Sequence, residues 1–129
     1  MEVAEARASV TLSVTLLKSP FQIERQMALD AVRPGGLREM HWHPNADEWQ
    51  YWIKGKGRMT VFNTGPHAMT MDFNPGDVGY VKRSHGHVIK NVGECDLQFL
   101  EVFKSDSFAD ISLSDWLARA LTTPYRIEP

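Results

Sequence analysis

The chain has 129 residues, which is enough for one hydrophobic core but not for two. Hydrophobic residues make up 43% of it and charged residues 23%, a balance that excludes a disordered segment, a collagen-like repeat or a coiled coil. Fourteen basic and sixteen acidic side chains leave a formal charge of -2, so no cationic excess is available for nucleic acid. Because Cys95 is the only cysteine, any metal must be held by histidine and carboxylate groups.

The first residues lack the features of a secretory signal. Glu2 and Glu5 stand where such a signal is basic, and no apolar region with a cleavage site follows. The longest apolar stretch, residues 10–17, alternates with polar residues and is too short to span a bilayer. We therefore expect a cytoplasmic protein with no membrane contact.

Alternation of apolar and polar residues predicts strands through most of the chain, because a strand with one buried face has a period of two. In chain order, the predicted strands are 9–17, 26–32, 39–43, 48–53, 58–62, 68–73, 78–81, 87–91 and 97–103. Turn residues such as Pro34-Gly35-Gly36 separate them. Many short strands with regular turns predict an all-β antiparallel sandwich or barrel.

One segment has helical spacing instead. Its apolar residues fall on one stripe and end before a proline: Leu113, Trp116, Leu117, Ala120 and Leu121, then Pro124. Ser112 or Ser114 is a suitable N-cap, so a short C-terminal helix is predicted at about 113–121. We expect this helix to pack across one end of the barrel.

Histidine and glutamate residues occur with the spacing of metal ligands. His41 and His43 are two apart on a predicted strand and therefore point to the same side. Glu48 opens the next antiparallel strand, which brings its carboxylate back beside them, and His87 can complete the set from downstream. Three imidazoles and one carboxylate suit Mn(II), Fe(II), Ni(II) or Zn(II), and an octahedral ion would keep two positions for substrate, water or dioxygen.

Glycines lie at fixed distances before and after these residues. The spacings resemble the two cupin motifs, G-x5-H-x-H-x4-E-x6-G and G-x5-P-x-G-x2-H-x3-N, and the first motif matches at every position from Gly35 to Gly55. The second departs where Lys82 replaces proline and Ser84 replaces glycine. Segments 38–51, 58–62, 76–81, 100–104 and 108–117 are similar to bacterial and fungal oxalate decarboxylases.

The resemblance implies a double-stranded β-helix, or jelly-roll, cupin barrel. Residues 1–129 would form a single cupin domain with a core at about 20–121 and an N-terminal strand or arm at 1–19, whereas oxalate decarboxylases usually contain two such domains. It also implies that His41, His43, Glu48 and His87 are the metal ligands. The family's usual ion is Mn; the ligand set itself also admits Fe, Ni or Zn.

Arg38 is the candidate for substrate contact. It stands where the family that this chain resembles has a substrate-orienting arginine, and a guanidinium can hold a carboxylate through two hydrogen bonds. Arg38 lies three positions before His41, which puts the two on opposite faces of a regular strand. A bulge or a twist at the start of the strand is therefore needed for Arg38 to reach the metal.

Decarboxylation of oxalate also needs a proton donor, which the family takes from a glutamate in a flexible lid. The corresponding stretch here, residues 105–112, contains no glutamate. Asp106 or Asp110 could substitute, although the shorter side chain must lie closer. Glu101 is a third candidate because it interrupts an apolar alternation and so points into the barrel.

These residues favour a Mn-dependent enzyme that resembles oxalate decarboxylase or oxidase and acts on a small carboxylate. Two alternatives remain: a cupin oxygenase, isomerase or cyclase acting on a larger metabolite, and a non-catalytic cupin that binds metal or a small ligand. A lone cupin leaves sheet edges and an apolar outer face exposed, so we also expect a homodimer or higher homo-oligomer. The alternating strand at 10–16 suits pairing with a second subunit.

Overall fold

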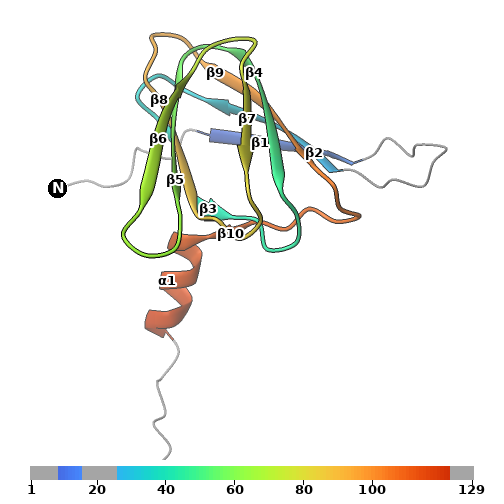
Figure 1. Ribbon diagram of the computed structural model, residues 1–129, viewed down its shortest axis with the longest axis vertical. Helices are drawn as coiled ribbons and strands as arrows, with labels where there is room; N and C mark the ends of the chain where they lie inside the picture. The colour runs from blue at the N-terminus through green and yellow to red at the C-terminus, as the bar shows by residue number, and fades with distance from the viewer. Residues whose placement is uncertain (1–8, 16–25, 123–129) are drawn as a thin grey trace, which may run out of the picture.

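Two five-stranded antiparallel sheets face each other as a barrel in the computed structural model, which describes residues 9–15 and 26–122 (Figure 1). The strands are β1 (Ser9–Thr15), β2 (Gln26–Val32), β3 (Leu37–Trp42), β4 (Glu48–Lys54), β5 (Gly57–Phe62), β6 (Ala68–Phe73), β7 (Val78–Val81), β8 (His87–Asn91), β9 (Leu97–Phe103) and β10 (Ile111–Ser112). One sheet has the order β1-β2-β9-β4-β7 and the other β10-β3-β8-β5-β6. From β2 onward the chain crosses repeatedly between the sheets, so the predicted all-β barrel is confirmed.

Most predicted strand boundaries agree with the structure. Strands β2, β6, β7, β8 and β9 have the predicted bounds, and β4 and β5 each extend by one residue. Strand β3 starts two residues earlier than predicted and ends one residue earlier, so His43 lies between the strand and the turn that starts at Pro44. The predicted end of the first strand, at residues 16–17, lies outside the described residues. Strand β10 was not predicted, since two residues carry no alternation.

Glycines of the first and second motifs occupy turn positions that other residues avoid. Gly55, between β4 and β5, has a φ of 85°, and Gly76, between β6 and β7, has a φ of 94°. A Cβ atom on Gly55 would also lie 2.8 Å from the backbone of Leu97. Glycine adopts this left-handed conformation without strain, which lets the chain cross between the two sheets at these turns.

The barrel interior has an apolar part and a polar part. The apolar part is a cluster of eight buried residues: Val32, Trp52, Met59, Phe73, Val81, Ile89, Leu97 and Phe99. Strand β4 passes from one part to the other, because its inward residues are Glu48, Gln50 and then Trp52. Strand β8 does the same with His87 followed by Ile89. Glu48 and His87 therefore lie on strands that the apolar cluster holds in place.

Helix α1 (Leu113–Thr122) confirms the predicted helix but not its full packing. The Asp115 amide donates to Ser112 Oγ at 3.4 Å, which identifies Ser112 as the N-cap. The helix contacts β3 and β10, where the Trp116 ring meets Trp42 edge-on at 6.0 Å. Beyond that contact the helix points away from the barrel (Figure 1), and Trp116 and Leu117 are 59% and 50% exposed. It therefore does not cover the barrel end as we expected.

Helix length bears on the question of membrane insertion. Within the part of the chain that the structure describes, no helix has the length and apolar character needed to cross a bilayer.

Candidate metal centre

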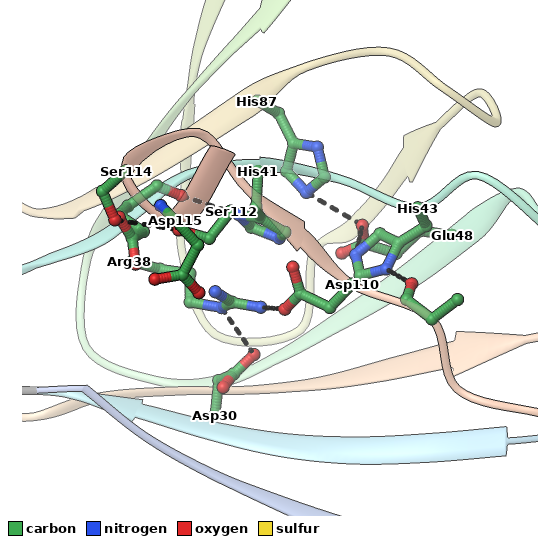
Figure 2. Close-up of polar contacts among 12 residues, drawn as sticks. Asp30, Arg38, His41, His43, Glu48, His87, Asp110, Ser112, Ser114 and Asp115 are labelled. Carbon is green, nitrogen blue, oxygen red and sulfur yellow. Dashed lines mark hydrogen bonds and ion pairs between the residues drawn. The ribbon is translucent and has the colours of Figure 1, made fainter. Parts of the chain in front are cut away.

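Four side chains from three strands and one turn meet inside the barrel. His41 is on β3, His43 follows it directly, Glu48 begins β4 and His87 begins β8. One ligand atom from each lies within 4.8 Å of the other three, and none of the residues is more than 3% exposed. The register explains the convergence, because His41 pairs with His87 across β3 and β8. The four residues with metal-ligand spacing are thus brought to one point (Figure 2).

Backbone carbonyls fix the orientation of the three imidazole rings. The Nδ1 atoms of His41, His43 and His87 lie 2.7, 2.8 and 3.1 Å from the carbonyl oxygens of Glu39, Ala109 and His85. A carbonyl only accepts hydrogen bonds, so each Nδ1 carries the proton and donates. Each Nε2 of a neutral ring then presents a lone pair to the centre, which is the usual arrangement of histidines that bind a metal.

The atoms that face the centre fit a divalent ion. The three Nε2 atoms and Glu48 Oε2 are buried, and none meets a partner in hydrogen-bond geometry. Glu48 Oε2 lies 2.9 Å from His87 Nε2 and 3.2 Å from His43 Nε2. Ligands at right angles around an ion, with bonds of about 2.1 Å, lie about 3.0 Å apart. Buried polar atoms without partners are costly, and a bound cation satisfies all four of them.

Gln50 orients the carboxylate ligand. Its Nε2 donates to Glu48 Oε1 at 2.6 Å, which leaves Oε2 to face the histidines. Both side chains point inward because they are two apart on β4. A Cβ atom on Gly79 would lie 2.6 Å from Gln50 Oε1, so the absence of a side chain at Gly79 makes room for this pair. We did not predict Gln50, although its spacing from Glu48 was a usable signal.

Burial and close charges shift the pKa values at the centre in opposite directions. Burial, together with His87 and Arg38, lowers the pKa of His41 to about 2, so this ring stays neutral. Burial alone would raise the pKa of Glu48, but contacts from His43 and His87 outweigh it and hold that pKa well below its usual value. Burial likewise opposes protonation of His43, but Glu48 raises its pKa. An ionised carboxylate among imidazoles is a suitable ligand set for a cation.

Arg38 reaches the interior through an irregularity in β3. The pairing of β3 with β8 shifts register between Arg38 and His41, which is the bulge that the spacing required. Arg38 is 7% exposed, its Nη2 donates to Asp110 Oδ2, and its Nε lies 3.9 Å from Asp30 Oδ2 (Figure 2). Burial alone would lower the pKa of Arg38, but the carboxyl groups of Asp110, Glu101 and Asp30 raise it. The guanidinium therefore stays charged beside the ligands.

Glu101 points into the barrel as predicted. It is fully buried on β9, where it pairs in register with Ala28 on one side and Gln50 on the other. Burial raises the pKa of Glu101 well above its usual value near 4.5, and the carboxyl groups of Glu48 and Asp30 raise it further. Arg38 opposes this shift without cancelling it. The surroundings of Glu101 therefore favour its protonated, neutral form.

The two candidate aspartates lie in different places on the loop between β9 and β10, residues 104–110. Asp110 turns inward and binds Arg38. Asp106 is exposed, and its carboxylate accepts from Ser107 Oγ at 3.2 Å. The structure therefore gathers Arg38, Glu101 and Asp110 near the ligands and leaves Asp106 on the surface.

Asp30 is a second interior residue that we did not predict. It is fully buried on β2, between the inward residues Ala28 and Val32. A charged residue that interrupts an apolar alternation was the same signal that drew attention to Glu101. The buried polar part of the barrel thus contains three carboxyl groups, of Asp30, Glu48 and Glu101, with Arg38 among them.

The stretch that departs from the second motif lies on the outside. Lys82 and His85 line an open groove of about 490 Å³ together with apolar side chains of β5 and β6, including Val61, Met69 and Met71. None of the four metal-ligand residues lines this groove. The side chains of Lys82 and His85 therefore face away from the candidate metal centre, whereas the backbone of the stretch contacts it, because the Ser84 amide donates to the His43 carbonyl and the His85 carbonyl accepts from His87 Nδ1.

Known proteins resemble this chain in sequence. The profile of the family described as Cupin matches residues 4–127. Oxalate decarboxylase OxdC of Bacillus subtilis (strain 168) is 56% identical over 91 residues, which cover 70% of this chain and 24% of that protein. An oxalate decarboxylase of Arthroderma benhamiae is 47% identical over 110 residues, covering 83% and 25%. The chain thus spans about a quarter of the length of these curated relatives.

Solved structures agree with the fold. Oxalate decarboxylase of Lactobacillus farciminis in a formate complex superimposes with a TM-score of 0.80 at 40% identity, covering 88% of this chain and 33% of that one. Bacillus subtilis oxalate decarboxylase, whose Mn(II) centres have been studied, gives a TM-score of 0.80 at 45% identity, covering 92% and 31%. The chain belongs to the cupin family.

Proposed function

We propose that this cupin binds one Mn(II) ion through His41, His43, Glu48 and His87 and converts a small carboxylate, with oxalate as the first candidate. The observation that carries the proposal is the burial of Arg38 beside the complete ligand set. The similarity to oxalate decarboxylases supports oxalate, and the Mn(II) centres of one such relative support the choice of ion. Because the chain spans a quarter of those relatives, activity of this stretch by itself is part of the proposal.

Arg38 and Gln50 have separate roles beside the metal in this proposal. The metal would act as a Lewis acid and redox partner for the carboxylate. Arg38 binds one carboxylate end and orients it, since a guanidinium matches a carboxylate through paired hydrogen bonds. Gln50 keeps Glu48 turned toward the ligands. The apolar cluster beyond Trp52 keeps bulk water out of the barrel, which strengthens these electrostatic contacts.

Glu101 is the proposed proton donor. Oxalate decarboxylation consumes one proton: the carbon–carbon bond breaks, one half leaves as carbon dioxide, and the other half is protonated on carbon to give formate. Glu101 is buried, it lies close enough to Arg38 for their charges to interact, and its raised pKa favours the protonated form that a proton donor needs. Asp106 is exposed and Asp110 is bound to Arg38, so neither is as well placed.

The test is a product assay with Mn(II)-loaded protein and oxalate under air. Formate together with one carbon dioxide per oxalate identifies decarboxylation; two carbon dioxide and one hydrogen peroxide per oxalate and dioxygen identify oxidation. For Glu101→Gln we expect formate formation to fall by about 10²- to 10⁴-fold while the metal stays bound. No product from wild-type protein with a filled site would overturn the proposal and leave a binding role or a different metabolite.

We propose further that the protein forms at least a dimer. Exposed apolar residues pair across β4 and β7 on the outer face of their sheet, Trp49 with Tyr80 and Tyr51 with Val78. Strand β1 pairs with β2 of its own chain and forms the end of that sheet, so its other edge supports the expected pairing with a second subunit. Sedimentation at micromolar concentration is expected to give a dimer or larger, and a monomer would contradict this.

A further inference from the structure

The guanidinium of Arg38 is bound to a carboxylate of the chain itself. Its Nη2 donates to Oδ2 of Asp110, which lies 72 residues further along the sequence, at the end of the 104–110 loop. Its Nε faces Asp30 at 3.9 Å. Arg38 therefore has one carboxylate in hydrogen-bond contact and a second one at the distance of an ion pair.

The Asp110 carboxyl lies on the side of Arg38 that faces the ligands. Figure 2 shows it between the guanidinium and the pair His43 and Glu48. The adjoining residue, Ala109, accepts the hydrogen bond from His43 Nδ1 at 2.8 Å, which places this end of the loop against the ligand set. Asp110 Oδ1 is buried and has no hydrogen-bond partner. A substrate carboxylate that bridges Arg38 and the metal needs this same space.

We propose that Asp110 is an internal competitor for Arg38, a carboxylate that the substrate must displace before it binds. The inference rests on the proposed function, because it takes Arg38 as the group that holds the substrate carboxylate. Asp110 is thereby a positioning residue that acts through Arg38, in place of the proton donor that its sequence position suggested. It lowers the apparent affinity for substrate, since only the fraction of molecules with a free guanidinium can bind.

The loop is anchored so that Asp110 can leave Arg38 without unfolding its neighbours. Asn45 Nδ2 donates to Ser105 Oγ and to the Ser107 carbonyl, both at 2.9 Å. The Phe108 ring packs against Phe103 at 5.3 Å. The Asp110 side chain is 20% exposed, so rotation about its own bonds can carry the carboxylate to water. Displacement then costs the Arg38 contact and leaves the anchors intact.

The experiment is calorimetric titration of oxalate into Zn(II)-loaded protein. Zn(II) has no redox chemistry and suits the ligand set, so oxalate stays intact, and metal analysis afterwards verifies that the ion remains bound. We expect Asp110→Asn and Asp110→Ala to bind oxalate about tenfold more tightly than wild type, because a hydrogen bond between charged groups no longer opposes binding. Asp96→Asn removes an exposed carboxylate from the β8–β9 turn and is the matched control, with unchanged affinity.

A gain in affinity separates this role from a structural one, because a loosened loop would weaken binding. Unchanged or weaker binding by both Asp110 variants would overturn the inference. Arg38→Gln tests whether Arg38 holds the substrate carboxylate. If this variant binds oxalate as wild type does, the proposed role of Arg38 fails. If it binds oxalate more weakly, that role stands whatever the Asp110 variants show. In wild-type protein with carbon-13-labelled aspartate, saturating oxalate should shift the Asp110 carboxyl resonance and not that of Asp96. An unmoved Asp110 signal would also overturn the inference.

Discussion

Buried polar groups at the two ends of β8 differ in whether their side-chain atoms have hydrogen-bond partners. At the end of the strand, Asn91 is 1% exposed and its amide is satisfied: Nδ2 donates to the carbonyls of Val32 and Cys95 at 2.8 Å, and Oδ1 accepts from the Gly93 amide at 2.9 Å. At its start, His87 is equally buried, but its Nε2 has no partner in hydrogen-bond geometry. The first arrangement stabilises a turn, and the second leaves an atom available for a ligand.

The same contrast divides the whole interior. Beyond Trp52 the barrel is filled by apolar side chains, whereas the half that contains His41, His43 and Glu48 collects buried polar atoms without hydrogen-bond partners. Such atoms destabilise a fold unless a ligand satisfies them. Apolar packing in one half therefore offsets the cost of a reactive site in the other, and substitutions in the two halves should have separable effects.

The largest expected effect on stability is in the apolar half. Trp52 stacks between Phe73 at 4.6 Å and Phe99 at 4.9 Å and is 1% exposed. Trp52→Ala should lower the free energy of unfolding by about 3–5 kcal/mol, as for other large aromatic residues in cores. Urea denaturation of the metal-free protein measures this, with Met69→Ala, 63% exposed on β6, as control. Equal losses of unfolding free energy for the two variants would contradict the stabilising role of the apolar half.

The largest effect on metal binding is expected in the polar half. Glu48→Ala should reduce metal affinity by more than about a hundredfold, because loss of even an outer hydrogen-bond partner of a ligand costs about 10- to 100-fold. Competition with a fluorescent chelator measures the affinity. Trp49→Ala changes the adjacent outward-facing residue and should keep wild-type affinity. Retention of metal by Glu48→Ala would remove the carboxylate from the proposed ligand set.

Sequence periodicity was sufficient for the candidate ligands because each lies on a strand or directly after one. His41 and His43 are two apart, and Glu48 and His87 open the strands that follow their turns, so a period of two places all four inside. Arg38 could be predicted only conditionally, since its odd spacing needed the bulge that the pairing of β3 and β8 now shows. A bulge depends on both paired strands and is not encoded in one stretch.

The loop and the helix were harder to predict for a physical reason. Asp106 and Asp110 are four residues apart in an irregular loop, and only tertiary contacts such as the one with Arg38 turn one inward and leave the other exposed. The stripe of helix α1 correctly predicted a helix, yet Leu117 remains half exposed. Amphipathic spacing defines a face without defining which surface covers it.

An intermediate effect is expected where a buried polar group is fully satisfied. Asn91→Ala removes three hydrogen bonds and leaves buried backbone groups without partners, which should lower the free energy of unfolding by about 1–3 kcal/mol. Metal affinity should not change, since Asn91 lies at the far end of β8 from His87. Thermal unfolding and metal titration of the same preparation test both statements. Loss of metal by this variant would show that the two halves are coupled.

The smallest expected effect is a dependence on pH. In the metal-free protein the pKa of Glu101 is raised above its unfolded value near 4.5, so the folded state binds more protons above that pH. The free energy of unfolding should therefore be highest below pH 4.5 with respect to this group and fall as pH rises toward the raised pKa. Glu101→Gln should lack this decrease and gain on wild type at higher pH. Parallel urea curves at pH 4.5 and 7.5 that show no such change would argue that Glu101 is ionised.

One metal ion, held by specific atoms of the polar half, is central to the proposed function. The direct measurement is a crystal structure of Mn(II)-loaded protein with anomalous data collected at the Mn absorption edge. We expect one peak per chain inside the barrel, bonded to the Nε2 atoms of His41, His43 and His87 and to Glu48 Oε2, with each Nδ1 still donating to its backbone carbonyl. An anomalous peak elsewhere, or a barrel without one after loading with excess Mn(II), would contradict the assignment of this centre.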